Sequence, residues 1–195
     1  MQPLIRPNTL TALRLPLAPL AVVCMTWGTT EGLVAAAVLA LLLEITDLAD
    51  GAIARRYGLV SPFGSLFDPF SDAFSRFTLF LGLYAIGVAD LWMIVAIFYR
   101  DSSISFFRSV AAVRQVVLSA RPSGKIKAIV QGVATQIVFI VLVVQALQPS
   151  WTWLNDIPWW TMALMTVVTV ASFFDYFFAN LPLLRAAWDN VPDPP

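Results

Sequence analysis

Residues 32–56, GLVAAAVLALLLEITDLADGAIARR, join a long apolar run to a group of charged side chains. With its neighbours, the apolar part is long enough to form most of a membrane-spanning helix. Charged groups are costly in hydrocarbon, so acidic residues directly after such a run form a functional-site hypothesis. The stretch therefore predicts a membrane-embedded helix, and it directs attention to Asp47 and Asp50.

The composition extends this prediction to the whole chain. Its 195 residues are 59% hydrophobic and 12% charged, which is typical of an integral membrane protein. Six apolar segments can each be extended into a helix of about 20 residues: 9–27, 32–46, 77–89, 91–99, 128–147 and 157–178. We expect the fourth helix to be longer, at about 91–118. We predict an all-α fold, an integral membrane bundle of six transmembrane helices with a short N-terminal interfacial helix at residues 6–14. We expect residues 1–186 to form a single membrane domain and 187–195 to form a disordered tail.

The basic residues predict the orientation in the membrane. With a cytoplasmic N-terminus and six spans, the outer connections fall near 28–31, 88–90 and 148–156, and they contain no Lys or Arg. All 12 basic residues then lie on or near the other side, which places both termini in the cytoplasm and the protein in the inner membrane. Because these residues are dispersed along the helices, no nucleic acid partner is indicated.

A second pair of acidic residues follows in the next predicted span. Asp47 and Asp50 share one helical face and Asp68 and Asp72 share another, and both pairs fall at the cytoplasmic membrane edge. Four carboxylates at such a place need protonation or bound cations. With no His and one Cys in the chain, hard oxygen ligands favour Mg²⁺, Mn²⁺ or Ca²⁺ over zinc. Two divalent ions would cancel the charge and suit displacement at phosphorus.

The spacing of these residues carries a family resemblance. The chain matches every position of the signature of the CDP-alcohol phosphotransferase family, through Asp47, Asp50, Gly51, Ala54, Arg55, Gly64, Asp68 and Asp72. Within that family, the segments RPNTLTALR (6–14), YRD (99–101) and SGKIK (123–127) resemble the bacterial phosphatidylglycerophosphate synthases.

The resemblance implies a six-span, homodimeric enzyme of the lipid bilayer with a cytoplasm-facing cavity and two divalent cations, Mg²⁺ or Mn²⁺. It implies transfer of the phosphatidyl group from CDP-diacylglycerol to an alcohol, with release of CMP. The implied metal ligands are Asp47, Asp50, Asp68 and Asp72, and Asp72 is also the implied catalytic base. The implied nucleotide-binding residues are Asp50, Gly51, Ala54, Arg55 and Gly64.

The acceptor is suggested by four basic residues in the second half of the chain. We expect them to bind the phosphate of sn-glycerol 3-phosphate: Arg100, Arg108, Lys125 and Lys127. Two positions depart from the phosphatidylglycerophosphate synthases, which usually have Lys where this chain has Ala73 and Thr where it has Ala128. Other acceptors therefore stay open, namely inositol phosphate, inositol, serine or choline, as does a CDP-choline type phosphotransferase.

Simpler interpretations compete with each assignment. The four aspartates could form structural ion pairs with Arg55, Arg56 or Arg76, and the basic residues could reflect membrane orientation alone. We expect Glu44 to pair with Arg76, and Asp175 to satisfy a contact between helices. A cation transporter would also place carboxylates in its spans, but nearer the midplane.

Overall fold

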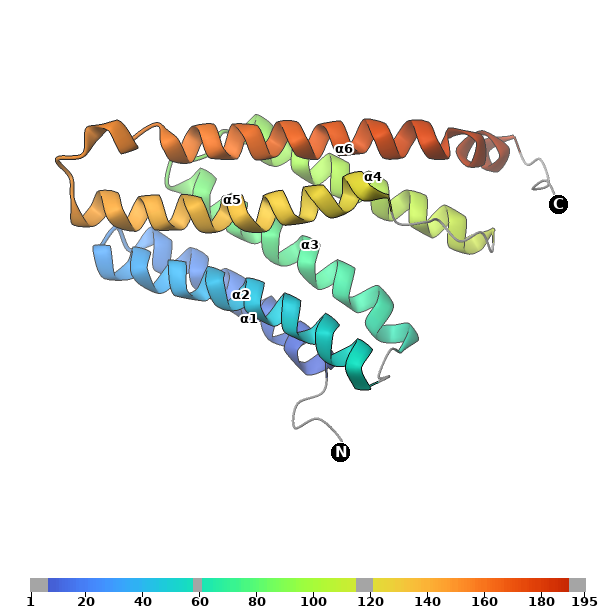
Figure 1. The fold of residues 1–195 in the computed structure, drawn as a ribbon, viewed down its shortest axis with the longest axis horizontal. Coiled ribbons are helices and arrows are strands. Elements are labelled where there is room, and N and C mark those ends of the chain that lie inside the picture. The colour runs from blue at the N-terminus through green and yellow to red at the C-terminus, as the bar shows by residue number, and fades with distance from the viewer. Residues whose placement is uncertain (1–6, 58–60, 115–120, 190–195) are drawn as a thin grey trace.

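The computed structural model describes residues 7–57, 61–114 and 121–189, and in that part of the chain it is helical throughout (Figure 1). This confirms the predicted all-α class. The long helices are α1 (Pro7–Thr26), α2 (Thr30–Tyr57), α3 (Pro62–Ala85), α4 (Leu91–Val113), α5 (Pro122–Leu147) and α6 (Ile157–Trp188). A single 3-10 turn, η1 (Thr152–Leu154), lies between α5 and α6.

Two of the helix starts show how local chemistry sets the boundaries. Ser61 caps α3, because its Oγ accepts a hydrogen bond from the backbone N–H of Gly64 at 3.0 Å and Pro62 fills the first helical position. At the start of α2, Thr29 Oγ1 accepts from the Gly32 N–H at 3.1 Å. Gly28, just before it, has a φ of +69°, which only glycine adopts without strain. A three-residue turn thus reverses the chain between α1 and α2.

The helices pack so that α1 links two elements that scarcely meet. Helix α1 lies along both α2 and α3, whereas α2 and α3 have little direct contact with each other. Helix α5 lies between α2 and α6, and α4 packs against α6 (Figure 1). Small buried residues, among them Ala18, Ala21, Ala36 and Ala40, allow close helix approach.

Within the described residues, four helical segments are long and apolar enough to cross a membrane: Asn8–Thr26, Thr30–Ile53, Pro122–Leu147 and Thr152–Arg185. Helices α3 and α4 differ from these because three charged residues lie within the body of each helix and leave no apolar stretch of spanning length. In α3 these are Asp68, Asp72 and Arg76, and in α4 they are Arg100, Asp101 and Arg108. The membrane character of the chain is therefore clear from four helices, while the six-span count stays a prediction.

The two ends of the bundle differ in charge. The connections at residues 27–29, 86–90 and 148–156 lie together at one end (Figure 1) and contain no Lys or Arg. Exposed tryptophans gather in the same segments, and two indole N–H groups, those of Trp92 and Trp159, donate to Asp90 Oδ2 at 3.2 and 3.0 Å. Aromatic residues with a polar contact are typical of a membrane interface.

The structure changes three sequence-based expectations about the helix ends. The separate interfacial helix is wrong for the described residues, because α1 runs without interruption from Pro7 to Thr26. The fourth helix, expected at 91–118, ends at Val113, and residues 115–118 lie outside the described part. Of the expected tail, Ala187 and Trp188 belong to α6, and 190–195 lie outside the described residues.

Candidate active site

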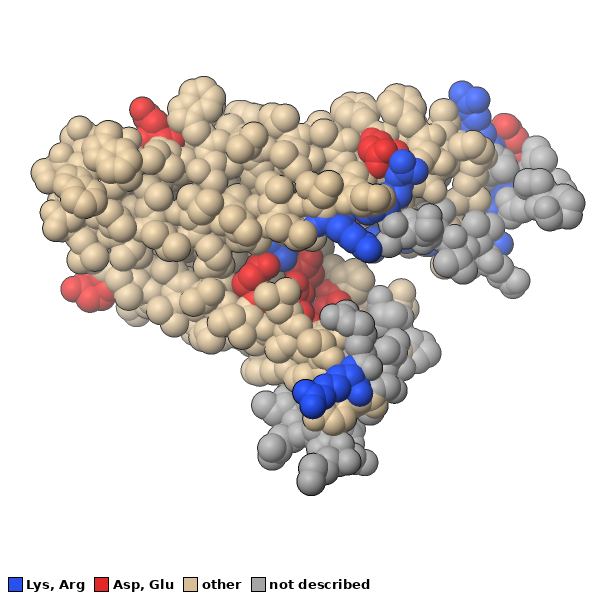
Figure 2. Space-filling model, viewed as in Figure 1, with Lys and Arg blue, Asp and Glu red and all other residues tan. Residues whose placement is uncertain are grey.

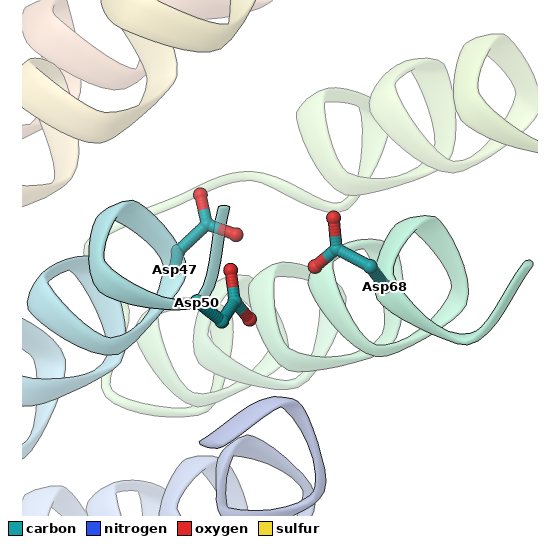
Figure 3. A group of neighbouring side chains, drawn as sticks. All are labelled: Asp47, Asp50 and Asp68. Carbon is teal, nitrogen blue, oxygen red and sulfur yellow. The ribbon is translucent and has the colours of Figure 1, made fainter. Parts of the chain in front are cut away.

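Three of the four predicted aspartates meet between two helices. Asp47 and Asp50 project from the last turns of α2 and Asp68 projects from the first half of α3, and the three side chains face one another (Figure 3). One carboxylate oxygen from each lies within 4.8 Å of the other two. The side chain of Asp50 is only 4% exposed, whereas that of Asp68 is 47% exposed. The cluster therefore has a buried side and a side open to solvent.

Arg14 of α1 lies at the buried side of this cluster. Its Nη1 donates to Asp47 Oδ1 at 2.5 Å, and its Nη2 donates to Asp50 Oδ2 at 2.5 Å and also to Asp68 Oδ1. The whole residue is 1% exposed although it carries a full charge. A buried guanidinium is retained only where carboxylates compensate it, so the three aspartates and Arg14 form one ionic unit.

Hydroxyl groups hold α1 in register with this unit. Thr11 Oγ1 donates to Asp50 Oδ2 at 2.9 Å, and Ser71 Oγ of α3 donates to the Thr11 carbonyl at 2.8 Å. One turn along α3, Ser75 Oγ donates to the Arg14 carbonyl at 3.3 Å. Position 14 is thus fixed by a hydrogen bond that its backbone carbonyl accepts as well as by the contacts of its side chain.

Asp72, the fourth predicted aspartate, contacts a different arginine. Arg76, one turn later on α3, donates from Nε to Asp72 Oδ1 at 2.7 Å. The Nη2 of Arg76 lies 3.5 Å from Glu44 Oε1 and 3.7 Å from Asp47 Oδ2. The expected Glu44–Arg76 pair is therefore confirmed. Through Arg76, Asp72 is joined to the same group of charges as Asp47.

The site carries surplus negative charge. Five carboxylates, those of Glu44, Asp47, Asp50, Asp68 and Asp72, face two guanidinium groups, those of Arg14 and Arg76, which leaves a formal charge of −3. Five of these residues line a small pocket: Glu44, Asp47, Asp72, Arg14 and Arg76. Figure 2 shows acidic side chains gathered in a recess of the surface. An all-oxygen donor set with unbalanced negative charge fits a hard divalent cation.

The expected nucleotide-binding residues are only partly described. Gly51 follows Asp50 on α2 and is partly exposed, while the side chains of Ala54 and Arg55 lie outside the described part. At Gly64, a Cβ atom would come within 2.8 Å of Asn8 Oδ1, so this glycine allows α1 and α3 to approach closely. Space for the α1–α3 contact is one reason for glycine there, independent of any ligand.

The four basic residues expected to bind an acceptor fall into two pairs. Arg100 Nη1 donates to Asp101 Oδ1 at 2.8 Å, and Lys127 Nζ lies 2.9 Å from the same oxygen. Arg100 Nε also donates to Ser172 Oγ at 3.1 Å, which links α4 to α6. By contrast, Arg108 and Lys125 are exposed. The structure therefore brings Arg100 and Lys127 together but does not bring all four to one point.

Asp175 connects α6 to the start of α5. It accepts from Arg121 Nε and Nη2, both at 2.9 Å, and from Ser123 Oγ at 2.5 Å. This bidentate contact confirms the expected role of Asp175 in a contact between helices. It holds the turn of α5 that precedes Lys125 and Lys127.

Two site residues were missed by sequence reasoning. The sequence-based prediction of the site does not include Arg14, although a charged residue among apolar neighbours is itself an intramembrane signal. Asp101 was grouped with Arg100, but nothing in the sequence indicates that Lys127, 26 positions later, shares its carboxylate.

The sequence of this chain is similar to those of known proteins. A model of the family described as CDP-alcohol phosphatidyltransferase matches residues 4–171. A "Probable phosphatidylglycerophosphate synthase" of Mycobacterium tuberculosis is 34% identical over 131 residues, which cover 65% of this chain and 62% of that protein. A "CDP-diacylglycerol--glycerol-3-phosphate 3-phosphatidyltransferase" of Bacillus subtilis is 29% identical over 195 residues, which cover 93% of this chain and 97% of that protein. The match thus spans less than two thirds of the mycobacterial relative but nearly all of the bacillar one.

Proposed function

Because this chain belongs to the CDP-alcohol phosphatidyltransferase family, we propose that it transfers the phosphatidyl group of CDP-diacylglycerol to sn-glycerol 3-phosphate. The products are phosphatidylglycerophosphate and CMP. The observation that carries the proposal is the meeting of Asp47, Asp50 and Asp68 within 4.8 Å in a site of net negative charge. The names of the relatives from Bacillus subtilis and Mycobacterium tuberculosis support glycerol 3-phosphate as the acceptor.

The carboxylates would hold two divalent cations, Mg²⁺ or Mn²⁺. The proposed ligands are Asp47, Asp50, Asp68 and Asp72. When bound, such ions supply Lewis-acid stabilisation of the charge on the pyrophosphate oxygens. The protein's own contribution is to fix carboxylates from α2 and α3 in one place, so that little reorganisation is needed when the substrate arrives.

Asp72 is the proposed general base for the acceptor hydroxyl. Arg76 Nε binds its Oδ1 at 2.7 Å and thereby sets the orientation of the carboxylate. Its Oδ2 makes no hydrogen bond to the described residues, and the side chain is 35% exposed. A solvent-accessible oxygen with a fixed direction suits proton abstraction from an approaching alcohol.

The nucleotide and acceptor would bind on either side of this centre. We assign Asp50, Gly51, Ala54, Arg55 and Gly64 to the cytidine nucleotide. Arg100 and Lys127, with Arg108 and Lys125, are the proposed partners of the acceptor phosphate. Gly132, one to two turns after Lys127 on α5, packs against the Glu44 carboxylate, which supports a position of this helix next to the acidic cluster. A doubly charged phosphate would compensate these cations, whereas a neutral alcohol would not.

The membrane arrangement is part of the proposal. Six spans with both termini and the site on the cytoplasmic side of the inner membrane agree with the Lys- and Arg-free connections at the other end. The homodimer, which the resemblance implies, and the single domain at 1–186, which the apolar segments indicate, stay predictions.

The test is release of CMP from CDP-diacylglycerol by the purified protein in detergent. We expect release that requires glycerol 3-phosphate, stops with EDTA and returns with Mg²⁺ or Mn²⁺. An Asp68→Asn variant should lose at least about a hundredfold in rate, because one ligand charge of the centre is removed. Activity that persists in chelator would contradict the metal-dependent reaction.

A competition assay decides the acceptor separately. Glycerol 3-phosphate, inositol 1-phosphate, inositol, serine and choline are supplied together at equal concentration, and the lipid products are separated. We expect phosphatidylglycerophosphate to dominate. Preferential use of inositol 1-phosphate would change the named acceptor, and preferential use of an unphosphorylated alcohol would refute the phosphate pocket while leaving the transfer chemistry intact.

A further inference from the structure

Arg14 is a buried cation whose side-chain polar contacts to the described residues are all made to Asp47, Asp50 and Asp68. Both of its terminal nitrogens donate to carboxylates, which belong to Asp47, Asp50 and Asp68. Its Nε is buried and has no hydrogen-bond partner among the described residues. The guanidinium therefore serves no other polar group in the described part of the chain.

The position of Arg14 in the fold gives this contact a structural role. Helices α2 and α3 have little direct contact, whereas α1 lies along both of them. The carboxylates of Asp47 and Asp50 come from α2, and that of Asp68 comes from α3. Without a cation between them, three carboxylates this close would repel one another and drive the two helices apart. The charge of Arg14 removes that repulsion and ties α1 to both neighbours.

The same three carboxylates are the group that could hold a metal ion, with one oxygen from each within 4.8 Å of the others. Each oxygen that donates electron density to a cation is less available to a guanidinium, and two positive groups at one site repel each other. A bound divalent cation and Arg14 in its present place thus compete for the same negative charge.

We propose that Arg14 is an internal counter-ion of the acidic cluster, which keeps α1, α2 and α3 together in the metal-free protein and which an incoming divalent cation must partly displace. This inference rests on the proposed metal site, but it is independent of the acceptor. It makes Arg14 a positioning residue with two opposite effects: it stabilises the metal-free fold and it weakens metal binding.

The experiment uses metal alone, without substrate, on the full-length protein in detergent. Mn²⁺ binding is followed by the electron paramagnetic resonance signal of free Mn²⁺, and thermal unfolding is measured in EDTA and in Mg²⁺. For Arg14→Gln we expect Mn²⁺ to bind about tenfold to a hundredfold more tightly, because a competing positive charge is removed. We expect the unfolding temperature in EDTA to fall by about 5–10 °C and to recover largely in Mg²⁺.

Two control variants separate charge from shape. Arg14→Lys keeps the positive charge but loses the planar fork, and we expect its Mn²⁺ affinity to stay within about threefold of the wild-type value. Thr11→Val disturbs α1 at the same carboxylate, Asp50, without any change of charge, and it should not raise the affinity for Mn²⁺.

The other possible results either support or overturn the inference about Arg14. Weaker or unchanged Mn²⁺ binding by Arg14→Gln overturns the inference, because Arg14 would then organise the ligands rather than compete for them. An Arg14→Gln protein that can be recovered only in Mg²⁺ supports it, and one that Mg²⁺ fails to rescue overturns it. If the wild-type protein binds no Mn²⁺ at all, the proposed metal site itself fails.

Discussion

The four basic residues of the proposed acceptor pocket differ sharply in their surroundings. Lys127 is 7% exposed and shares Asp101 with Arg100, whereas Lys125 is exposed two positions earlier on the same helix. We predict that Lys127→Ala lowers the free energy of unfolding by about 1–3 kcal/mol, because the partly buried carboxylate of Asp101 loses one of its partners. Lys125→Ala should change it by less than about 0.5 kcal/mol.

Kinetics on the same two variants test their role in binding. Both should raise KM for glycerol 3-phosphate by roughly tenfold and leave KM for CDP-diacylglycerol within about twofold, since each removes one charge-assisted contact to the phosphate. The measurement is steady-state CMP release with either substrate varied. An equal rise in both KM values would argue against a phosphate contact and for a general disturbance of the site.

Single residues also show where sequence reasoning reaches its limit. The pairing of Glu44 with Arg76 was predictable, because an intramembrane carboxylate needs a partner at a similar depth. The contact of Arg14 with Asp68 joins residues 54 positions apart, and it depends on how α1 packs against α3. No spacing rule within one helix contains that information, so the acidic cluster could be predicted and its counter-ion could not.

At the scale of helices, α2 and α5 approach each other closely next to the site. A Cβ atom at Gly132 would meet the carboxylate of Glu44, with Glu44 Cδ at 2.9 Å. Because Arg76 holds that carboxylate, an added methyl group must either displace Glu44 or move α5 away from α2. We predict that Gly132→Ala lowers the free energy of unfolding by about 1–3 kcal/mol, measured by thermal or denaturant unfolding in detergent.

Gly124 offers a matched control on the same helix. A Cβ atom there would meet nothing within 4 Å, so Gly124→Ala should be neutral or stabilising by up to about 1 kcal/mol. If both variants had the same stability, the α2–α5 contact would not be as tight as the packing of Gly132 against Glu44 requires.

Helix existence was easier to predict than helix ends. The apolar segments gave six helices, and all six are present in the described residues. The ends depend on caps and on continuation through polar residues. Thus α3 begins at Pro62, behind the Ser61 cap and before its apolar stretch, and α5 begins at Pro122. Hydropathy does not indicate such caps, so the helix ends predicted from apolar segments differ from the observed ends by several residues.

For the whole molecule, the open question is whether α3 and α4 cross the bilayer with the other four helices. Three exposed residues can report on this arrangement. Leu91 begins α4, Ser150 lies in the connection between α5 and α6, and Asp189 directly follows α6. In a Cys24→Ser background, we predict that L91C and S150C react with a membrane-impermeant maleimide on intact cells. D189C should react only after permeabilisation, because the C-terminus is cytoplasmic in the six-span arrangement.

The pattern of maleimide labelling distinguishes a six-span arrangement from one in which α3 and α4 do not cross the membrane. Without a crossing of α3 and α4, residue 91 would lie on the cytoplasmic side, and L91C would behave like D189C. The Cys24→Ser protein without an added cysteine should not react, since Cys24 is the chain's single cysteine. Helices α3 and α4 lack an apolar stretch of spanning length because charged residues lie within the body of each helix. Those charged residues belong to the proposed site.

The length of α2 has a further consequence. Asp47 lies 17 residues after Thr30, which at 1.5 Å per residue is about 26 Å along the helix, close to the thickness of the hydrocarbon layer. The carboxylates therefore sit at the boundary between acyl chains and water. For the proposed reaction, one substrate arrives by lateral diffusion in two dimensions and the other from bulk solution in three. The rate should accordingly follow the mole fraction of CDP-diacylglycerol in the surface, and the newly made lipid stays in the leaflet from which its precursor came.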